Sequence, residues 1–159
     1  MQLFFNIDKI VSVSLFWDCD KEKIEKIGLL LYSFRLSMIE PSMSQGLSLV
    51  YRALKDFFKN GGLDSRVFEY IDLSGYSDFA MKVYLYTKNI AFGETVYYSD
   101  IARSVGVNNA QRAVGRVLSA NRYPLIIPCH RVISNKGTGG FKYGVKLKKQ
   151  LLDYESMFL

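Results

Sequence analysis

An apolar stretch bounded by prolines, residues 124–133, constrains the fold of this chain more than any other segment. It reads Pro-Leu-Ile-Ile-Pro-Cys-His-Arg-Val-Ile, and it contains His130, the single histidine among the 159 residues. Aliphatic side chains at this density are removed from water in a folded protein, and the two prolines restrict the backbone. We therefore predict that the segment is buried and rigid, and that the Cys129 thiol reaches solvent only through a pocket.

Any histidine-assisted sulfur chemistry of this chain must use His130, and Cys129 is its neighbour in the sequence. A thiolate is the attacking species, and an imidazole can accept the proton of the thiol. Neighbouring side chains on an extended chain point to opposite faces, so the two need not touch. A buried cysteine is also often an inert small hydrophobe. We favour a catalytic role for the pair.

A carboxylate that orients the histidine would complete such a site. Two candidates, Asp153 and Glu155, lie at the end of a helix that we predict over residues 145–154. A carboxylate at the C-terminal end of a helix opposes the helix dipole, which suggests a compensating partner. We choose Glu155, although physical reasoning alone does not separate it from Asp153.

Composition narrows the class of protein. The chain is 49% hydrophobic, which is enough to form a core, and its length suits one medium domain or two small ones. It has neither an apolar run of about 20 residues nor the features of a signal peptide. Its two cysteines, Cys19 and Cys129, indicate neither a disulfide framework nor zinc-ligand spacing. We expect an intracellular, cytoplasmic protein without a metal or cofactor.

The positive charge of the chain lies in its C-terminal half. Residues 88–159 carry 11 Lys and Arg against four Asp and Glu, whereas residues 1–87 carry 10 against 11. A one-sided basic excess is typical of proteins that bind a polyanion, and nucleic acid is the first candidate. A solvated basic face has the same composition, so charge alone does not decide between the two.

Residues 1–75 have the pattern of a small α/β scaffold domain. Apolar and polar residues alternate in segments 3–7 and 10–16, which predicts two strands, and the apolar run 27–34 predicts a third. Residues 46–59 then change to helical spacing. The sequence Asn60-Gly61-Gly62 predicts the end of this helix.

Residues 76–159 have the pattern of a mostly helical second domain. We predict helices over residues 78–90, 98–105 and 109–120. Asn108 is a candidate N-cap for the third helix, with Gln111 at the N3 position of a capping-box-like arrangement. Two short helices joined by a glycine-containing turn are typical of a helix-turn-helix, in which the second helix contacts DNA.

The predicted helix over residues 109–120 has two distinct faces. The apolar face consists of Ala110, Ala113, Val114, Val117 and Leu118, and the opposite face carries Arg112, Arg116 and Ser119. Together with the charge asymmetry, this face favours DNA binding. Gly115 costs about 1 kcal/mol of helix propensity relative to alanine. Close approach of DNA would explain it, and tight packing within the protein is the more frequent cause.

Several motifs in residues 76–156 together resemble the O6-alkylguanine-DNA alkyltransferase family, also called methylated-DNA–protein-cysteine methyltransferases. They are Phe92-Gly93-Glu94, Tyr98, the sequence Gln-Arg-Ala-Val-Gly around Arg112, Pro128-Cys129-His130-Arg131-Val132, Gly139-Gly140 and the last helix with Glu155. Arg112 lies 17 residues before Cys129. The N-terminal half resembles the family only in size and layout.

The resemblance implies a fold and an activity. The fold would be an α/β (α+β) arrangement, with a ribonuclease H-like N-terminal domain and a winged helix-turn-helix-like C-terminal domain. The activity would be DNA repair by irreversible, stoichiometric transfer of an alkyl group from O6-alkylguanine, and from O4-alkylthymine, to Cys129. The partner would be the minor groove of double-stranded DNA, from which the nucleotide is flipped, and we expect a monomer.

The resemblance also implies residue roles. Cys129 would attack the alkyl carbon and keep the alkyl group as a thioether. His130 would deprotonate the Cys129 thiol through a water, and Glu155 would orient His130. Asn121 would brace the site between the helix and the cysteine segment. Tyr98 would donate a proton or hydrogen bond to the departing guanine and press on the neighbouring phosphate.

The remaining roles concern DNA and the alkyl group. Arg112 would fill the gap in the base stack when the nucleotide turns out. The expected DNA contacts are Arg112, Tyr98, Gly115, Arg116, Ser119 and Arg122. The expected pocket residues are Pro124, Val132, Gly139, Gly140, Phe141 and Lys142.

The sequence departs from the family pattern at three positions away from the reacting atoms. Phe141 stands in place of a tyrosine common in the pocket loop, which puts the range of alkyl groups in doubt. Ala91 and Arg122 each stand where a proline is common, and we expect Arg122 to add a phosphate contact.

Three other functions fit parts of the sequence. A damage-sensing relative without repair activity would lack the cysteine, which is present here. A cysteine peptidase normally has its cysteine and histidine far apart in sequence. A winged-helix regulator would bind DNA as a sequence-specific dimer, and its cysteine would only pack.

Overall fold

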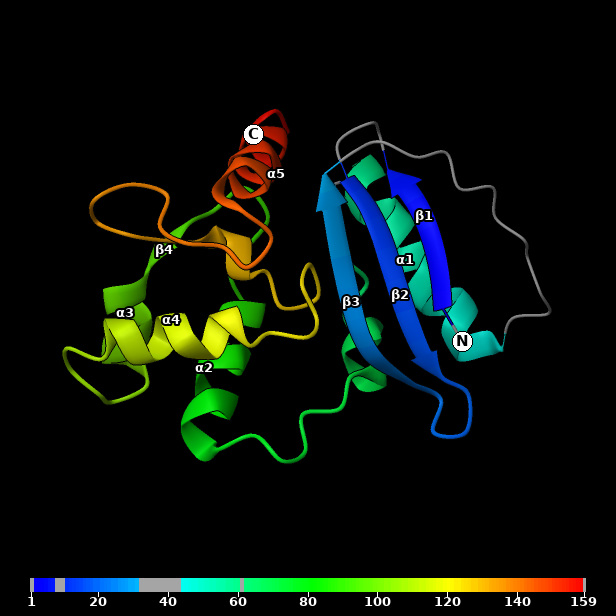
Figure 1. Ribbon diagram of the computed structural model, residues 1–159, viewed down its shortest axis with the longest axis horizontal. Coiled ribbons are helices and arrows are strands. Elements are labelled where there is room, and N and C mark those ends of the chain that lie inside the picture. The colour runs from blue at the N-terminus through cyan, green and yellow to red at the C-terminus, as the bar shows by residue number, and fades with distance from the viewer. Residues whose placement is uncertain (1, 8–10, 32–43, 61, 159) are drawn as a thin grey trace. The chain divides into compact units, whose positions relative to one another are not determined.

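The chain forms two compact units, one with a three-stranded sheet and one that is mostly helical (Figure 1). The computed structural model describes residues 2–7, 11–31, 44–60 and 62–158, and the chain divides into Met1–Asp72 and Leu73–Leu159. We expect the boundary after residue 75, close to this division. The expected mixed class of helices and strands is confirmed.

The first unit contains a three-stranded antiparallel sheet in the order β1-β2-β3. Its strands are β1 (Gln2–Ile7), β2 (Val11–Asp18) and β3 (Lys23–Leu31). Alternation in β2 directs Val13, Leu15 and Trp17 into the core, each at most 2% exposed. The two predicted strands at the N-terminus are therefore present, and Ile10 lies outside the described residues.

The third strand begins earlier than the apolar run 27–34 indicates. β3 starts at Lys23 because it pairs with β2 directly after a tight turn, in which Glu22 has a left-handed φ of 48°. The polar residues at the start of β3 are therefore in the strand because they pair with β2, although their sequence is not apolar. Residues 32–34 of the predicted run lie outside the described residues.

Helix α1 (Gln45–Asn60) lies against one face of the sheet (Figure 1). Its buried side is apolar and consists of Leu47, Val50, Ala53, Leu54, Phe57 and Phe58. Each of the larger side chains contributes about 1.5–3 kcal/mol through burial. The helix ends at Asn60, where we predict it to end, and Gly61 lies outside the described residues. The unit continues with a 3-10 helix, η1 (Ser65–Tyr70).

The second unit is mostly helical. Its helices are α2 (Asp78–Lys88), α3 (Tyr98–Ser104), α4 (Gln111–Ser119) and α5 (Val145–Ser156), with a 3-10 turn η2 (Cys129–Arg131). Two short parallel strands, β4 (Val96–Tyr97) and β5 (Val132–Ile133), join the segment before α3 to the segment after η2. This pairing places the Cys129 region beside the start of α3.

Helices α2, α3 and α4 pack together, and α5 contacts η2 (Figure 1). The buried side of α4 is formed by Val114 and Leu118, while Arg112, Arg116 and Ser119 are exposed. The two faces predicted for this helix are therefore present. Among the described residues, no helix combines the length and apolar character needed to cross a bilayer.

The predicted N-cap of α4 is wrong. The helix begins at Gln111, its N-cap position is Ala110, and no side chain caps it. Asn109 instead has a left-handed φ of 60°, so the chain turns sharply before the helix begins. Asparagine tolerates this conformation better than most residues, which explains its presence in the turn.

We predict that Asn109→Ala lowers the free energy of unfolding by about 1 kcal/mol, because alanine pays the full steric cost of positive φ. Asn108→Ala is the matched control and should change stability by less than about 0.5 kcal/mol, since Asn108 is exposed. Urea unfolding of both variants measures the difference. If Asn108→Ala lowered the free energy of unfolding more than Asn109→Ala does, Asn108 would be the helix cap after all.

Candidate active site

The proline-bounded segment is buried, as predicted. All residues from 123 to 132 are buried, and Leu125 is held at a φ of 76°, which costs about 1–2 kcal/mol for a residue with a side chain. At Pro128 the chain turns tightly, with the Cys129 N–H donating to the Ile127 carbonyl at 2.7 Å. The 3-10 turn that follows gives Cys129 and His130 different surroundings.

The Cys129 thiol lies against the side chain of Asn121, which is buried in the loop after α4. Nδ2 of Asn121 donates to Cys129 Sγ at 3.2 Å and to the Ile127 carbonyl at 2.9 Å. Oδ1 accepts from the Tyr123 N–H at 2.9 Å. The backbone partners fix the amide so that its nitrogen faces the sulfur.

Burial raises the pKa of the Cys129 thiol above its usual value. The hydrogen bond from Asn121 and the nearby charges of Lys148 and Lys142 act in the opposite direction. The resting sulfur is therefore a thiol, and it needs a base before it can attack. The Asn121 amide favours the thiolate once it forms.

His130 is fully buried and bonds to the Glu155 carboxylate. Its Nε2 lies 2.7 Å from Glu155 Oε1. Burial lowers the pKa of His130, although Glu155 raises it, so the imidazole is neutral at neutral pH. An ionised carboxylate only accepts, so Nε2 carries the hydrogen and Nδ1 has the free lone pair. Within the described part of the chain, no protein group bonds to Nδ1.

Two further groups hold the Glu155 carboxylate. Arg131 donates Nε to Oε2 at 2.9 Å and Nη2 to Oε1 at 3.0 Å, and the Gly93 N–H donates to Oε2 at 3.0 Å. A third guanidinium nitrogen donates to the Ile90 carbonyl at 2.7 Å. Burial alone would raise the pKa of Glu155, but His130 and Arg131 lower it to about 2. The carboxylate is thus ionised under all ordinary conditions.

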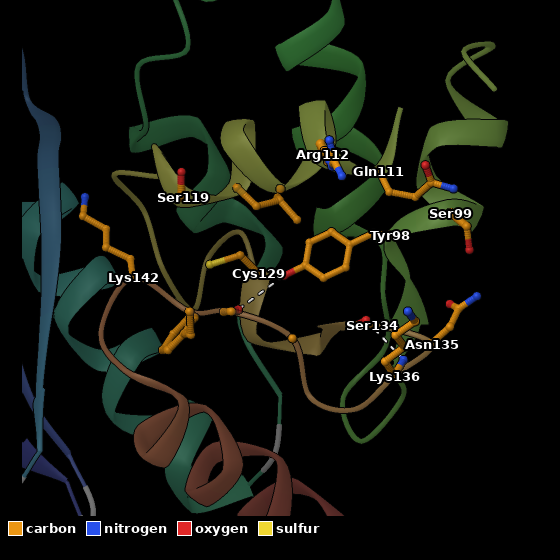
Figure 2. Close-up of a pocket in the computed structure, with 15 residues that line it drawn as sticks. Tyr98, Ser99, Gln111, Arg112, Ser119, Cys129, Ser134, Asn135, Lys136 and Lys142 are labelled. Carbon is orange, nitrogen blue, oxygen red and sulfur yellow. Dashed lines mark hydrogen bonds between the residues drawn. The ribbon is translucent and has the colours of Figure 1, made fainter. Parts of the chain in front are cut away.

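Cys129 lines a cavity of about 620 Å³ (Figure 2). The other lining residues come from the start of α3, the outer face of α4 and the loop over residues 134–142. Among those described residues, Arg112, Lys136 and Lys142 are cationic and none is acidic. The cavity therefore attracts an anionic ligand such as a nucleic acid.

Tyr98 forms part of the wall beside Cys129 (Figure 2). Its hydroxyl donates to the Gly140 carbonyl at 3.3 Å. Burial, and then the nearby Cys129, raise the pKa of the phenol, so it is protonated and can donate a hydrogen. Gly139 has a φ of 72°, and a Cβ there would lie 3.0 Å from the ring, so glycine is required.

Several expected DNA and pocket residues line the cavity together. They are Tyr98, Arg112, Gly115, Ser119, Gly139, Gly140, Phe141 and Lys142. A Cβ at Gly115 would lie 3.9 Å from the Tyr98 ring, an ordinary contact, so packing within the protein does not demand this glycine.

Other expected residues lie elsewhere. Pro124 and Val132 are buried and are not among the described residues that line this cavity. Arg116 is exposed on α4, outside the lining. The Arg122 guanidinium lies on protein groups, with Nε donating to the Tyr76 hydroxyl at 3.0 Å.

Sequence reasoning missed three residues that hold the site. Arg131 and Gly93 were recognised only as parts of motifs, and their common contact with Glu155 depends on tertiary structure. Lys148 is fully buried, and its ammonium donates to the carbonyls of Val132 and Gly140. Burial lowers its pKa to about 8. A charged residue on the apolar face of α5, two helical turns before Glu155, was an available signal.

Comparison with known proteins identifies the family. The family described as 6-O-methylguanine DNA methyltransferase, DNA binding domain, matches residues 78–157. A probable methylated-DNA–protein-cysteine methyltransferase of Acanthamoeba polyphaga mimivirus is 36% identical over 147 residues, which cover 92% of this chain and 91% of that protein. The chain belongs to the O6-methylguanine-DNA methyltransferase family.

Solved methyltransferase structures agree with this assignment. The Mycobacterium tuberculosis protein OGT, solved in complex with DNA, is 26% identical with a TM-score of 0.72, over 96% of this chain and 91% of that one. The O6-methylguanine-DNA methyltransferase of Pyrococcus kodakaraensis has the same fold, with a TM-score of 0.72 at 23% identity over 97% of each chain. The resemblance found in the sequence is confirmed.

Glu155→Gln should lower the free energy of unfolding at pH 7 by about 3–5 kcal/mol, because Arg131 loses its buried counter-charge. The folded-state pKa of Glu155, about 2, lies below the usual 4.5. The stability that ionisation contributes is therefore present above pH 4.5 and lost as pH falls toward 2.

Urea unfolding across this pH range should show the difference between variant and unmodified protein shrinking with acid. Asp153→Asn removes an exposed carboxylate from the same helix and serves as the control. Equal losses in the two variants would contradict a special role for the buried group.

Proposed function

We propose that this protein repairs double-stranded DNA by transferring the alkyl group of O6-alkylguanine to its own Cys129. The same reaction extends to O4-alkylthymine, whose alkyl carbon is bonded to an equivalent oxygen. The observation that carries the proposal is a thiol next in the chain to a histidine that pairs with a buried carboxylate. The thiol lines a cavity whose described lining residues include three cations and no acidic group. Membership of the methyltransferase family supports it.

The proton of the thiol passes to His130. Glu155 accepts from Nε2, so Nδ1 is the atom that takes the proton, through one bridging water. The imidazolium that forms lies against an ionised carboxylate, which stabilises it. The Asn121 amide donates to the sulfur as it becomes a thiolate.

The thiolate then attacks the alkyl carbon in one displacement step. The sulfur–carbon bond forms while the carbon–O6 bond breaks, and the bonding electrons leave with the guanine. The Tyr98 hydroxyl supplies a proton or hydrogen bond to the departing base, because its raised pKa keeps it protonated. Where Tyr98 gives up its proton, the proton that His130 took from the thiol returns through solvent to the Tyr98 oxygen. The net change replaces the S–H and alkyl–O6 bonds by an S–alkyl bond and a proton on guanine.

The product is a thioether, which has no easy leaving reaction. Nothing in the mechanism restores the thiol, so each protein molecule reacts once. The protein is therefore both the transferase and the acceptor, and repair capacity equals the number of intact Cys129 thiols.

The alkylated nucleotide must leave the duplex to reach the cavity, at a cost of a few kcal/mol. Arg112 lies on the exposed face of α4 and lines the cavity, where its planar guanidinium can occupy the vacated place in the stack. Arg116 and Ser119 on the same face contact the DNA backbone, and Tyr98 presses on the phosphate next to the flipped nucleotide. We propose that α4 enters the minor groove, and that the protein binds as a monomer and recognises damage rather than sequence.

The direct test is a mass measurement after incubation with a duplex containing O6-methylguanine. We expect the Cys129 peptide to gain one methyl group, and Cys129→Ala to gain none while still binding the duplex. Loss of the methyl group from DNA without a methyl gain on the Cys129 peptide would contradict the proposal. Transfer that survives in Cys129→Ala would identify Cys19 as the acceptor.

Arg112→Ala should slow reaction with duplex by about 10-fold or more, because the flipped state loses its stabilising side chain. Reaction with free O6-benzylguanine should be nearly unchanged, since no nucleotide has to be flipped. Transfer rates on both substrates measure the effect. Equal slowing on both would remove the flipping role.

A further inference from the structure

Tyr76 and Tyr84 form an aromatic cluster that is bonded to the end of α4, directly before the loop that carries Asn121. The rings of Tyr76 and Tyr84 meet edge to face, with centroids 5.1 Å apart and planes at 87°. The Tyr84 hydroxyl donates to the Val117 carbonyl at 2.9 Å. The cluster thus joins α2 to the last turn of α4, directly before the loop.

Arg122 attaches the loop itself to this cluster. Its Nε donates to the Tyr76 hydroxyl at 3.0 Å, and its Cζ lies 5.5 Å from the ring centroids of both Tyr76 and Tyr123. A guanidinium combines a directional hydrogen bond with attraction to aromatic faces. The side chain that we expect on a DNA phosphate is therefore engaged within the protein.

We propose that Arg122 and Tyr76 form a positioning pair that keeps the Asn121 amide against the Cys129 sulfur. Arg122 lies between Asn121 and Tyr123 in the chain, and the Tyr123 N–H sets the orientation of the amide through its 2.9 Å bond to Oδ1. Fixing the Arg122 side chain therefore fixes the backbone on both sides of it. Neither member of the pair touches the reacting atoms, and the inference rests on the proposed transfer reaction.

The consequence for the thiol follows from the Asn121 hydrogen bond. Burial raises the pKa of Cys129, and the Asn121 amide lowers it. If the loop shifts, the amide no longer faces the sulfur and the thiolate loses its donor. Weakening the positioning pair should therefore make the thiol harder to ionise and slow its reactions at neutral pH.

The pH dependence of Cys129 alkylation by iodoacetamide, measured by peptide mass, tests this in the full-length protein. Arg122→Ala and Tyr76→Phe should each move the midpoint to higher pH and slow alkylation at pH 7 by about threefold. The double variant should shift no further than the larger single shift, because both groups act through one contact. Lys82→Ala removes an exposed cation from α2 and should leave the profile unchanged.

Transfer from free O6-benzylguanine and from an alkylated duplex separates positioning from DNA contact. Positioning predicts the same fractional loss on both substrates for Arg122→Ala. A loss confined to the duplex would assign Arg122 to a phosphate and overturn the proposal, as would an unchanged iodoacetamide profile.

Two controls keep the result interpretable. Tyr76→Phe removes a single oxygen, so it carries the test if Arg122→Ala does not fold. If the unmodified protein takes no alkyl group from either guanine substrate, the proposed function fails. The iodoacetamide profile still decides whether Arg122 and Tyr76 position the amide.

Discussion

The buried carboxylate of Glu155 is the interaction on which the second unit depends. Three parts of the chain meet there: the segment after α2 through Gly93 and Ile90, the η2 turn through His130 and Arg131, and α5 through Glu155 itself. An anion in the protein interior is tolerated only when donors surround it. The same donors that satisfy the charge also fix the imidazole, so structural and chemical requirements coincide at one group.

The sequence predicts most of the second unit because its signals are local. Helical spacing places α2, α3 and α4 within a few residues, and the apolar density of residues 124–133 correctly predicts burial. The contacts of Arg131 and Gly93 with Glu155 link positions 24 and 62 residues apart in the chain, which periodicity cannot reveal. Motif resemblance supplied Glu155, whereas dipole reasoning left Asp153 equally open.

The errors have specific physical causes. Asn108 fits the pattern of a helix cap, but its neighbour Asn109 takes the left-handed conformation and moves the helix start to Gln111. β3 extends to Lys23 because strand pairing, not hydropathy, sets its first residue. The contact of Arg122 with Tyr76 depends on the fold, which the sequence pattern does not reveal, and the expected phosphate contact of Arg122 stays a prediction.

The burial of Cys129 also affects how readily its thiol is oxidised. Oxidants attack thiolates that are exposed to solvent, and both burial and a raised pKa protect this sulfur. The exposed Cys19 lies open to the same oxidants. If each molecule reacts once, as we propose, this protection preserves the acceptor thiol until the protein meets alkylated DNA.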